Sequence, residues 1–122
     1  MQTERLLKLA DFLEQLPDKK FNINYIVYKR RETCVSVACA IGWMPAVFKE
    51  LKWEGYDSIV WPDNEELNSI KYNKNFAVAR VFFDIDVNLC NYLFDNGQIG
   101  YSTTKHVTKR IRKVVKLYRT TH

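Results

Sequence analysis

Apolar positions near the start of the chain recur at helical spacing. The recurring residues are Leu6, Leu9, Ala10, Leu13 and Leu16, and Leu7 and Phe12 widen the stripe that they form. An apolar stripe of this period, with polar residues between its members, is typical of an amphipathic helix that buries one face. The pattern predicts a helix over residues 3–16, with Thr3 as its N-cap and Pro17 as the residue that stops it.

The middle of the chain changes its pattern three times. Residues 33–43 are apolar nearly all round, which predicts a central helix, and Pro45 suits the first turn of a short helix to Lys52. Residues 52–61 contain two short β-prone runs around Gly55 and Asp57 and predict a hairpin. The polar residues 63–74 predict a surface loop.

The last third of the chain predicts three helices. Asn75 caps one through Phe83, Asp84 ends it, and Asp86 caps the next. Ser102 or Thr103 caps a helix over about residues 104–118, whose apolar stripe is Val107, Ile111, Val114, Val115 and Tyr118. With no internal repeat and no linker, residues 1–122 are expected to form one domain. The predicted fold class is mainly α: a single compact helical domain with a small β-hairpin.

The composition of the chain indicates the cellular compartment in which the protein is expected. Residues of the hydrophobic set make up 47% of the 122 residues, which is enough for one core. No stretch approaches the roughly 20 apolar residues of a membrane helix, and charged residues interrupt the first ten positions where a signal peptide would be apolar. The three cysteines, an odd number, fit a reducing compartment. We therefore expect a cytoplasmic protein with no membrane partner.

Charge is concentrated at the end of the chain. Seven of the 19 basic residues lie in positions 101–122, and none of the 14 acidic residues does. The basic residues of this segment are Lys105, Lys109, Arg110, Arg112, Lys113, Lys116 and Arg119. They form a candidate binding face for phosphates or for an acidic protein surface. The alternative is a solvated helix whose late cations favour its C-terminal dipole.

A second candidate surface is aromatic. Trp53, Tyr56 and Trp61 lie in the predicted hairpin, and Trp and Tyr are enriched at interface hot spots. The alternative is that these rings pack the hairpin against the helices.

The sequence contains few of the residue patterns that catalytic or metal-binding sites require. Cys34 and Cys39 are five positions apart, which on one helix separates them by about 140° and prevents a disulfide. Neither of the two histidines stands at ligand spacing from a cysteine, and Asp84 and Asp86 lack the pattern of a calcium loop. The chain has no nucleotide-binding loop motif. We therefore expect no catalytic residues, no metal, no cofactor and no enzymatic activity.

Three segments together resemble a family of small phage and prophage proteins. They are LLKLADFLEQLP at residues 6–17, CVSVACAIGW at residues 34–43, and residues 77–94 with their paired phenylalanines. The second segment is similar to the family's Cys-Gly-Thr-x-x-Cys-Ala-x-Gly-Trp stretch. The resemblance implies a small, mainly helical, phage-encoded protein that acts in the cytoplasm of the bacterial host.

Two functions follow as hypotheses. Small phage proteins often bind a host factor, so the first is a non-enzymatic viral protein that binds a host protein or complex, such as a defence system that it inhibits. The alternative is a basic nucleic-acid-binding protein that uses its last helix. No zinc-finger or helix-turn-helix pattern offers base readout, so this second function would act through backbone phosphates.

Overall fold

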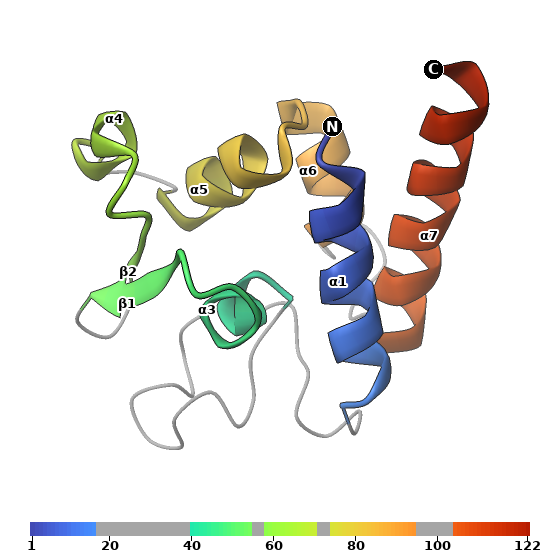
Figure 1. Cartoon of the computed structure of the whole chain (residues 1–122), viewed down its shortest axis with the longest axis horizontal. Coiled ribbons are helices and arrows are strands. Elements are labelled where there is room, and N and C mark those ends of the chain that lie inside the picture. Colours follow the sequence, from blue (N-terminus) through green and yellow to red (C-terminus); the bar gives the residue numbers. More distant parts are fainter. Residues whose placement is uncertain (17–39, 55–57, 71–73, 95–103) are drawn as a thin grey trace.

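The structure is a computed structural model that describes residues 1–16, 40–54, 58–70, 74–94 and 104–122 (Figure 1). Its elements, in chain order, are α1 (Thr3–Glu14), the 3-10 helix η3 (Ile41–Trp43), α3 (Met44–Val47), β1 (Lys52–Glu54), β2 (Ser58–Val60), α4 (Glu65–Asn68), α5 (Lys74–Phe83), α6 (Val87–Phe94) and α7 (Thr104–Thr121). The predicted fold class, mainly α with a small hairpin, is confirmed. No helix within these ranges has the length and hydropathy needed to cross a bilayer.

The first and last helices lie side by side, although the chain between them makes up most of the molecule (Figure 1). Most residues of the two predicted stripes are buried, whereas Leu16, Val114 and Tyr118 are half-buried. On α1 the buried residues are Leu6, Leu9, Ala10 and Leu13, and on α7 they are Val107, Ile111 and Val115. Burying one such side chain stabilises the fold by about 1.5–3 kcal/mol, so this seam is a major source of stability.

Aromatic rings fill the core where α5 crosses the molecule. The ring centroids of Phe48 and Phe82 lie 4.8 Å apart in an edge-to-face arrangement, and those of Phe82 and Phe83 lie 5.6 Å apart. The ring of Phe83 in turn stacks on that of Phe94, at the end of α6, at 5.9 Å. Such offset and edge-to-face pairs add to the free energy of burial itself. They join Phe48, the residue that follows α3, to α5 and α6 in one core.

The turn between α5 and α6 uses the two aspartates as predicted. Asp84 follows the last helical residue at φ 54°, in the left-handed region that ends many helices. The backbone N–H of Ile85 donates to the carbonyl of Arg80 at 2.9 Å, and that of Asp84 donates to the carbonyl of Val81 at 3.1 Å. Asp86 then accepts a hydrogen bond on Oδ1 from the N–H of Leu89 at 2.7 Å. The helix stop and the N-cap are both confirmed.

The hairpin is also confirmed, and one side chain attaches it to the helices. Lys52 pairs with Val60 and Trp53 with Ile59 in an antiparallel register. Asn75, predicted to cap the next helix, lies inside α5, and its side-chain oxygen accepts a hydrogen bond from the N–H of Ile59 at 2.8 Å.

Other element boundaries differ from the sequence predictions. The helix predicted from Pro45 to Lys52 ends at Val47, because Phe48 has extended backbone angles and buries its ring in the core. The predicted loop over residues 63–74 contains α4, whose Leu67 is buried. Thr3 does not cap α1. The N-cap position is Gln2, and the Thr3 hydroxyl accepts a hydrogen bond from Arg119 instead.

Several sequence predictions lie outside the described residues. The helix predicted over residues 33–43 is described only from Ala40 onward, where the chain forms η3. Cys34 and Cys39, Pro17, and the candidate caps Ser102 and Thr103 all lie in the remaining ranges.

Candidate binding surface on the C-terminal helix

Four lysines form a line along the outer side of α7. They are Lys105, Lys109, Lys113 and Lys116, here called the lysine stripe, and all four are exposed. Their spacing of four, four and three positions keeps them on one face of a helix, over about 16 Å of its length. None of the four makes an ion pair with any residue that the structure describes. The stripe therefore presents four ammonium groups to solvent on a single helix face.

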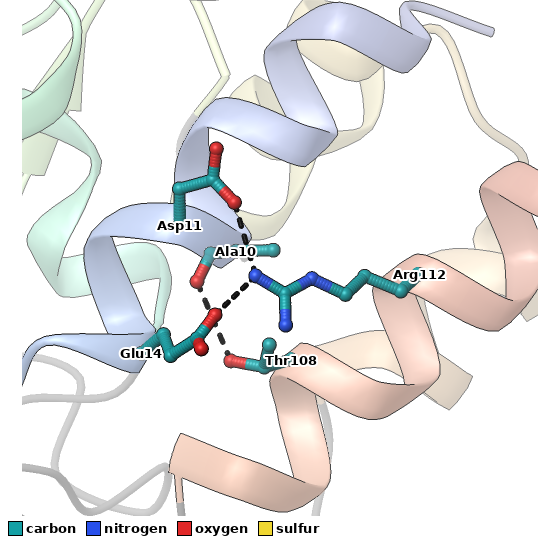
Figure 2. Close-up of polar contacts among 5 residues, drawn as sticks. All are labelled: Ala10, Asp11, Glu14, Thr108 and Arg112. Atoms are coloured by element: carbon teal, nitrogen blue, oxygen red, sulfur yellow. Dashed lines mark hydrogen bonds and ion pairs between the residues drawn. The ribbon is translucent and has the colours of Figure 1, made fainter.

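The arginines of the same helix contact neighbouring helices. Arg112 turns toward α1, where its Nη2 donates to Asp11 Oδ1 at 3.0 Å and also to Glu14 Oε2 (Figure 2). One turn away, the buried Thr108 hydroxyl donates to the carbonyl of Ala10 at 3.5 Å. The hydrogen bond with Glu14, followed by that with Asp11, raises the pKa of Arg112. We call this set of contacts the α1–α7 clasp.

The other two arginines also contact neighbouring elements. Arg119 donates from Nη2 to the Thr3 hydroxyl at 3.1 Å, which extends the clasp to the start of α1. Arg110 is half-buried, and its guanidinium carbon lies 5.8 Å from the ring centroid of Tyr92 on α6. A cation over an aromatic face is attracted by the ring quadrupole. The seven basic residues thus divide by type: the guanidinium groups contact α1 or α6, and the ammonium groups face solvent.

The sequence prediction treated the seven residues as one face and did not anticipate this division. A signal for it exists in α1. Asp11 and Glu14 are three positions apart and lie on one side of that helix, beside the apolar stripe. Two carboxylates so placed predict a cationic partner on a neighbouring element.

The aromatic candidates are part of the packing more than of a surface. Trp53 and Trp61 are both half-buried and pack against the hydrophobic core. The Trp61 ring lies 5.0 Å from that of Phe82, edge to face, and Arg5 stands over both rings. Tyr56 lies outside the described residues. These contacts match the packing alternative for Trp53 and Trp61.

The described cysteine is not placed for nucleophilic chemistry. Cys90 is buried on the inner side of α6, and its thiol lies 3.9 Å from the carbonyl oxygen of Phe76. Burial raises the pKa of the Cys90 thiol to about 11, against a smaller opposing effect of Arg80. A thiol at that pKa stays protonated at neutral pH and is a poor nucleophile. Within the described ranges, no three His, Cys, Asp or Glu side chains gather as metal ligands would.

Comparisons of the chain with protein-family models, with curated proteins and with solved structures find no match. The resemblance to the phage family therefore stays a prediction from the sequence.

Proposed function

We propose that this chain is a non-enzymatic, phage-encoded protein that binds an acidic surface of a host protein through the lysine stripe of α7. The class of target that we propose is a host defence protein, met in the bacterial cytoplasm. The observation that carries the binding role is the lysine stripe itself: four exposed ammonium groups on a helix of 18 residues that contains no acidic residue. The phage and host setting is supported by the sequence resemblance alone.

The stripe has a cost for the isolated protein. Like charges one helical turn apart destabilise a helix by about 0.2–0.5 kcal/mol for each pair. Lys105 with Lys109, and Lys109 with Lys113, are two such pairs. No acid on α7 offsets this repulsion, and the four lysines form no ion pair with the described residues. A binding role accounts for this arrangement, because a surface of one sign attracts and orients an oppositely charged partner.

The support beneath the stripe favours binding as well. Val107, Ile111 and Val115 fix the inner side of α7 in the core, and the α1–α7 clasp fixes one edge. A helix held in this way is already in its binding conformation. Association then avoids the free-energy cost of ordering a flexible segment.

A second candidate function is sequence-independent nucleic-acid binding. It is favoured by the residue type of the stripe, since lysine acts on phosphates as a point charge and needs no fixed fork geometry. The arginines of α7, which would read guanine edges, contact α1 and α6 instead. Such binding would weaken steeply with salt, in proportion to the number of phosphates contacted.

The test is retention of a host component by tagged protein from a bacterial lysate, with and without nuclease. Wild type is compared with the double variant Lys109→Glu/Lys113→Glu and with the control Lys49→Glu/Lys52→Glu. The control changes the charge equally at two exposed lysines outside α7. We expect wild type and control to retain one discrete host protein after nuclease treatment, and the stripe variant to lose it.

Two results would count against the proposal. Equal retention by the stripe variant would remove the lysine stripe from the function. Retention that disappears with nuclease and weakens with salt would instead establish the nucleic-acid candidate.

A further inference from the structure

On the side of α7 that faces α6, exposed apolar and aromatic residues replace the lysines. Leu117 is 56% exposed, although it lies one turn beyond Lys113 on the same helix. On α6, Tyr92 is 47% exposed, and its ring is the one that Arg110 covers. We call Leu117, Val114 and Arg110 on α7, together with Leu89 and Tyr92 on α6, the α6–α7 flank.

Helical spacing places the flank directly beside the lysine stripe. Arg110, Val114 and Leu117 are separated by four and three positions, so they share one side of α7, and Lys113 lies between that side and the rest of the stripe. Val114 and Leu89 are half-buried and pack against the core. The flank therefore leads from the core, through Val114, to the exposed Leu117.

The other edge of α7 is closed. There α1 runs alongside the helix, and the α1–α7 clasp occupies Arg112 and Arg119 (Figures 1 and 2). A partner that reaches the lysine stripe therefore meets charged and hydrogen-bonded groups on one edge. On the other edge it meets Leu117 and the Tyr92 ring, with the Arg110 guanidinium over that ring. This surface is therefore amphipathic. The lysine stripe runs along its outer side, and Leu117 and Tyr92 lie on the side toward α6.

We propose that the partner segment is an acidic amphipathic helix that lies along α7. This inference rests on the proposed binding of a host protein and specifies the part of it that is bound. Carboxylates one helical turn apart would meet Lys109 and Lys113, and an apolar residue on the neighbouring face would contact Leu117. Lys105 and Leu117 are twelve positions apart, so the segment needs about three helical turns.

Charge and apolar contacts have separate roles in such a complex. The lysines steer the acidic segment and select it against basic ones, which affects mainly the association rate. The apolar contact at Leu117 removes hydrocarbon from water and slows dissociation. A nucleic-acid backbone offers acceptors for the lysines, but no apolar side chain for Leu117. The flank therefore favours a protein segment over nucleic acid.

The test is selection of displayed random peptides, about 16 residues long, against the purified full chain. We expect the enriched peptides to carry acidic residues four positions apart, with an apolar residue three or four positions from one of them. Acidic enrichment without an apolar position would overturn this inference and leave the proposed function standing. No acidic enrichment, or no selected peptide at all, would overturn both.

Variants then locate the selected peptide on the surface. By fluorescence anisotropy, Leu117→Ala should weaken binding of the leading peptide roughly tenfold, the effect expected when one leucine loses its apolar contact. Val81→Ala is the matched control, because Val81 is an exposed residue on α5. Leu117→Ala should leave the affinity for a poly-glutamate peptide unchanged. Lys113→Glu should lower the affinity for both the leading peptide and the poly-glutamate peptide. An unchanged affinity of the leading peptide for Leu117→Ala would overturn the proposed apolar contact between the partner helix and α7.

Discussion

The two edges of α7 carry positive charge in different forms. Toward α1, the guanidinium of Arg112 bridges the carboxylates of Asp11 and Glu14. Along the outer side, the lysine stripe meets no carboxylate among the described residues. One nitrogen of the guanidinium, Nη2, donates to both carboxylates, whereas each ammonium group of the stripe is a hydrated charge on a flexible stem. The net charge of a segment therefore overstates the charge available to a partner.

The comparison also separates stability from binding within one helix. The edge toward α1 and the buried side hold α7 in place, and the four lysines of the outer side form no ion pair with the residues that the structure describes. Substitutions on the two sides are then expected to have different consequences, which the following variants test from the largest effect to the smallest.

The largest contrast is between the buried and the outer side of α7. Ile111→Ala removes a fully buried side chain from the seam with α1 and should lower the free energy of unfolding by about 2–5 kcal/mol. Leu117→Ala, at an exposed position, should change it by less than about 0.5 kcal/mol. Urea unfolding followed by circular dichroism measures both. Equal losses would contradict the division of the helix into two sides.

The next contrast concerns α6, whose inner side packs while its outer side stays exposed. The folded state holds the pKa of Cys90 at about 11, above the ordinary value of 9.0. Between these values the unfolded chain releases the thiol proton while the folded chain keeps it, so the stability contributed below pH 9 is lost as the pH rises. The loss amounts to about 2 kcal/mol by pH 11.

Urea unfolding of wild type and Cys90→Ala under reducing conditions, at pH 8 and at pH 10.5, isolates this effect. Cys34, Cys39 and the other titrating groups are common to both proteins. The stability advantage of wild type should therefore shrink at the higher pH. A constant difference between the two proteins would show that Cys90 is not shielded from water.

The clasp gives a smaller effect. Arg112→Ala should lower the free energy of unfolding by about 1 kcal/mol, because the guanidinium serves two carboxylates but stays partly exposed. Arg112→Lys should restore much of the loss, because both hydrogen bonds come from the single nitrogen Nη2 and an ammonium group can also donate to two acceptors. The effect should shrink in high salt. A double-mutant cycle with Glu14→Gln measures the coupling, and zero coupling energy would contradict the contact in Figure 2.

The smallest effect has the opposite sign. Lys113→Glu replaces a repulsive pair with Lys109 by an attractive one, which should stabilise the protein by up to about 0.5 kcal/mol. The same substitution should weaken binding of an acidic partner. Lys49→Glu, outside α7, controls for the change in net charge. Thermal unfolding and peptide binding measured on the same samples test the separation, and a variant that lost both stability and binding would contradict it.

Local patterns predicted most of the helical architecture. The apolar stripes of α1 and α7 were visible at helical spacing, and Asp84 and Asp86 marked the turn between α5 and α6. The early end of α3 was not predictable, because the core position of Phe48 overrides the local helical pattern. The short α4 was hidden in a polar segment in which Leu67 is the one buried residue among those whose burial is described, and one buried position gives no periodicity.

The candidate site was predicted only in outline. The basic segment was evident from composition, but the different positions of its arginines and lysines depend on α1, about a hundred positions away. The hydrogen bond from Arg112 to Asp11 spans 101 positions. No local pattern encodes such a pairing. Only the complementary signal in α1, the two acids three positions apart, points to it.

That long separation has a consequence for biosynthesis. The ribosome completes α1 first, and α7 follows only after the whole intervening core sequence has been made. Until then Leu6, Leu9 and Leu13 have no α7 against which to pack, so the amphipathic first helix is a candidate client for a chaperone. Closing the seam also requires closing a long loop, which slows folding. The surface proposed to engage a partner is thus among the last parts of the protein to be assembled.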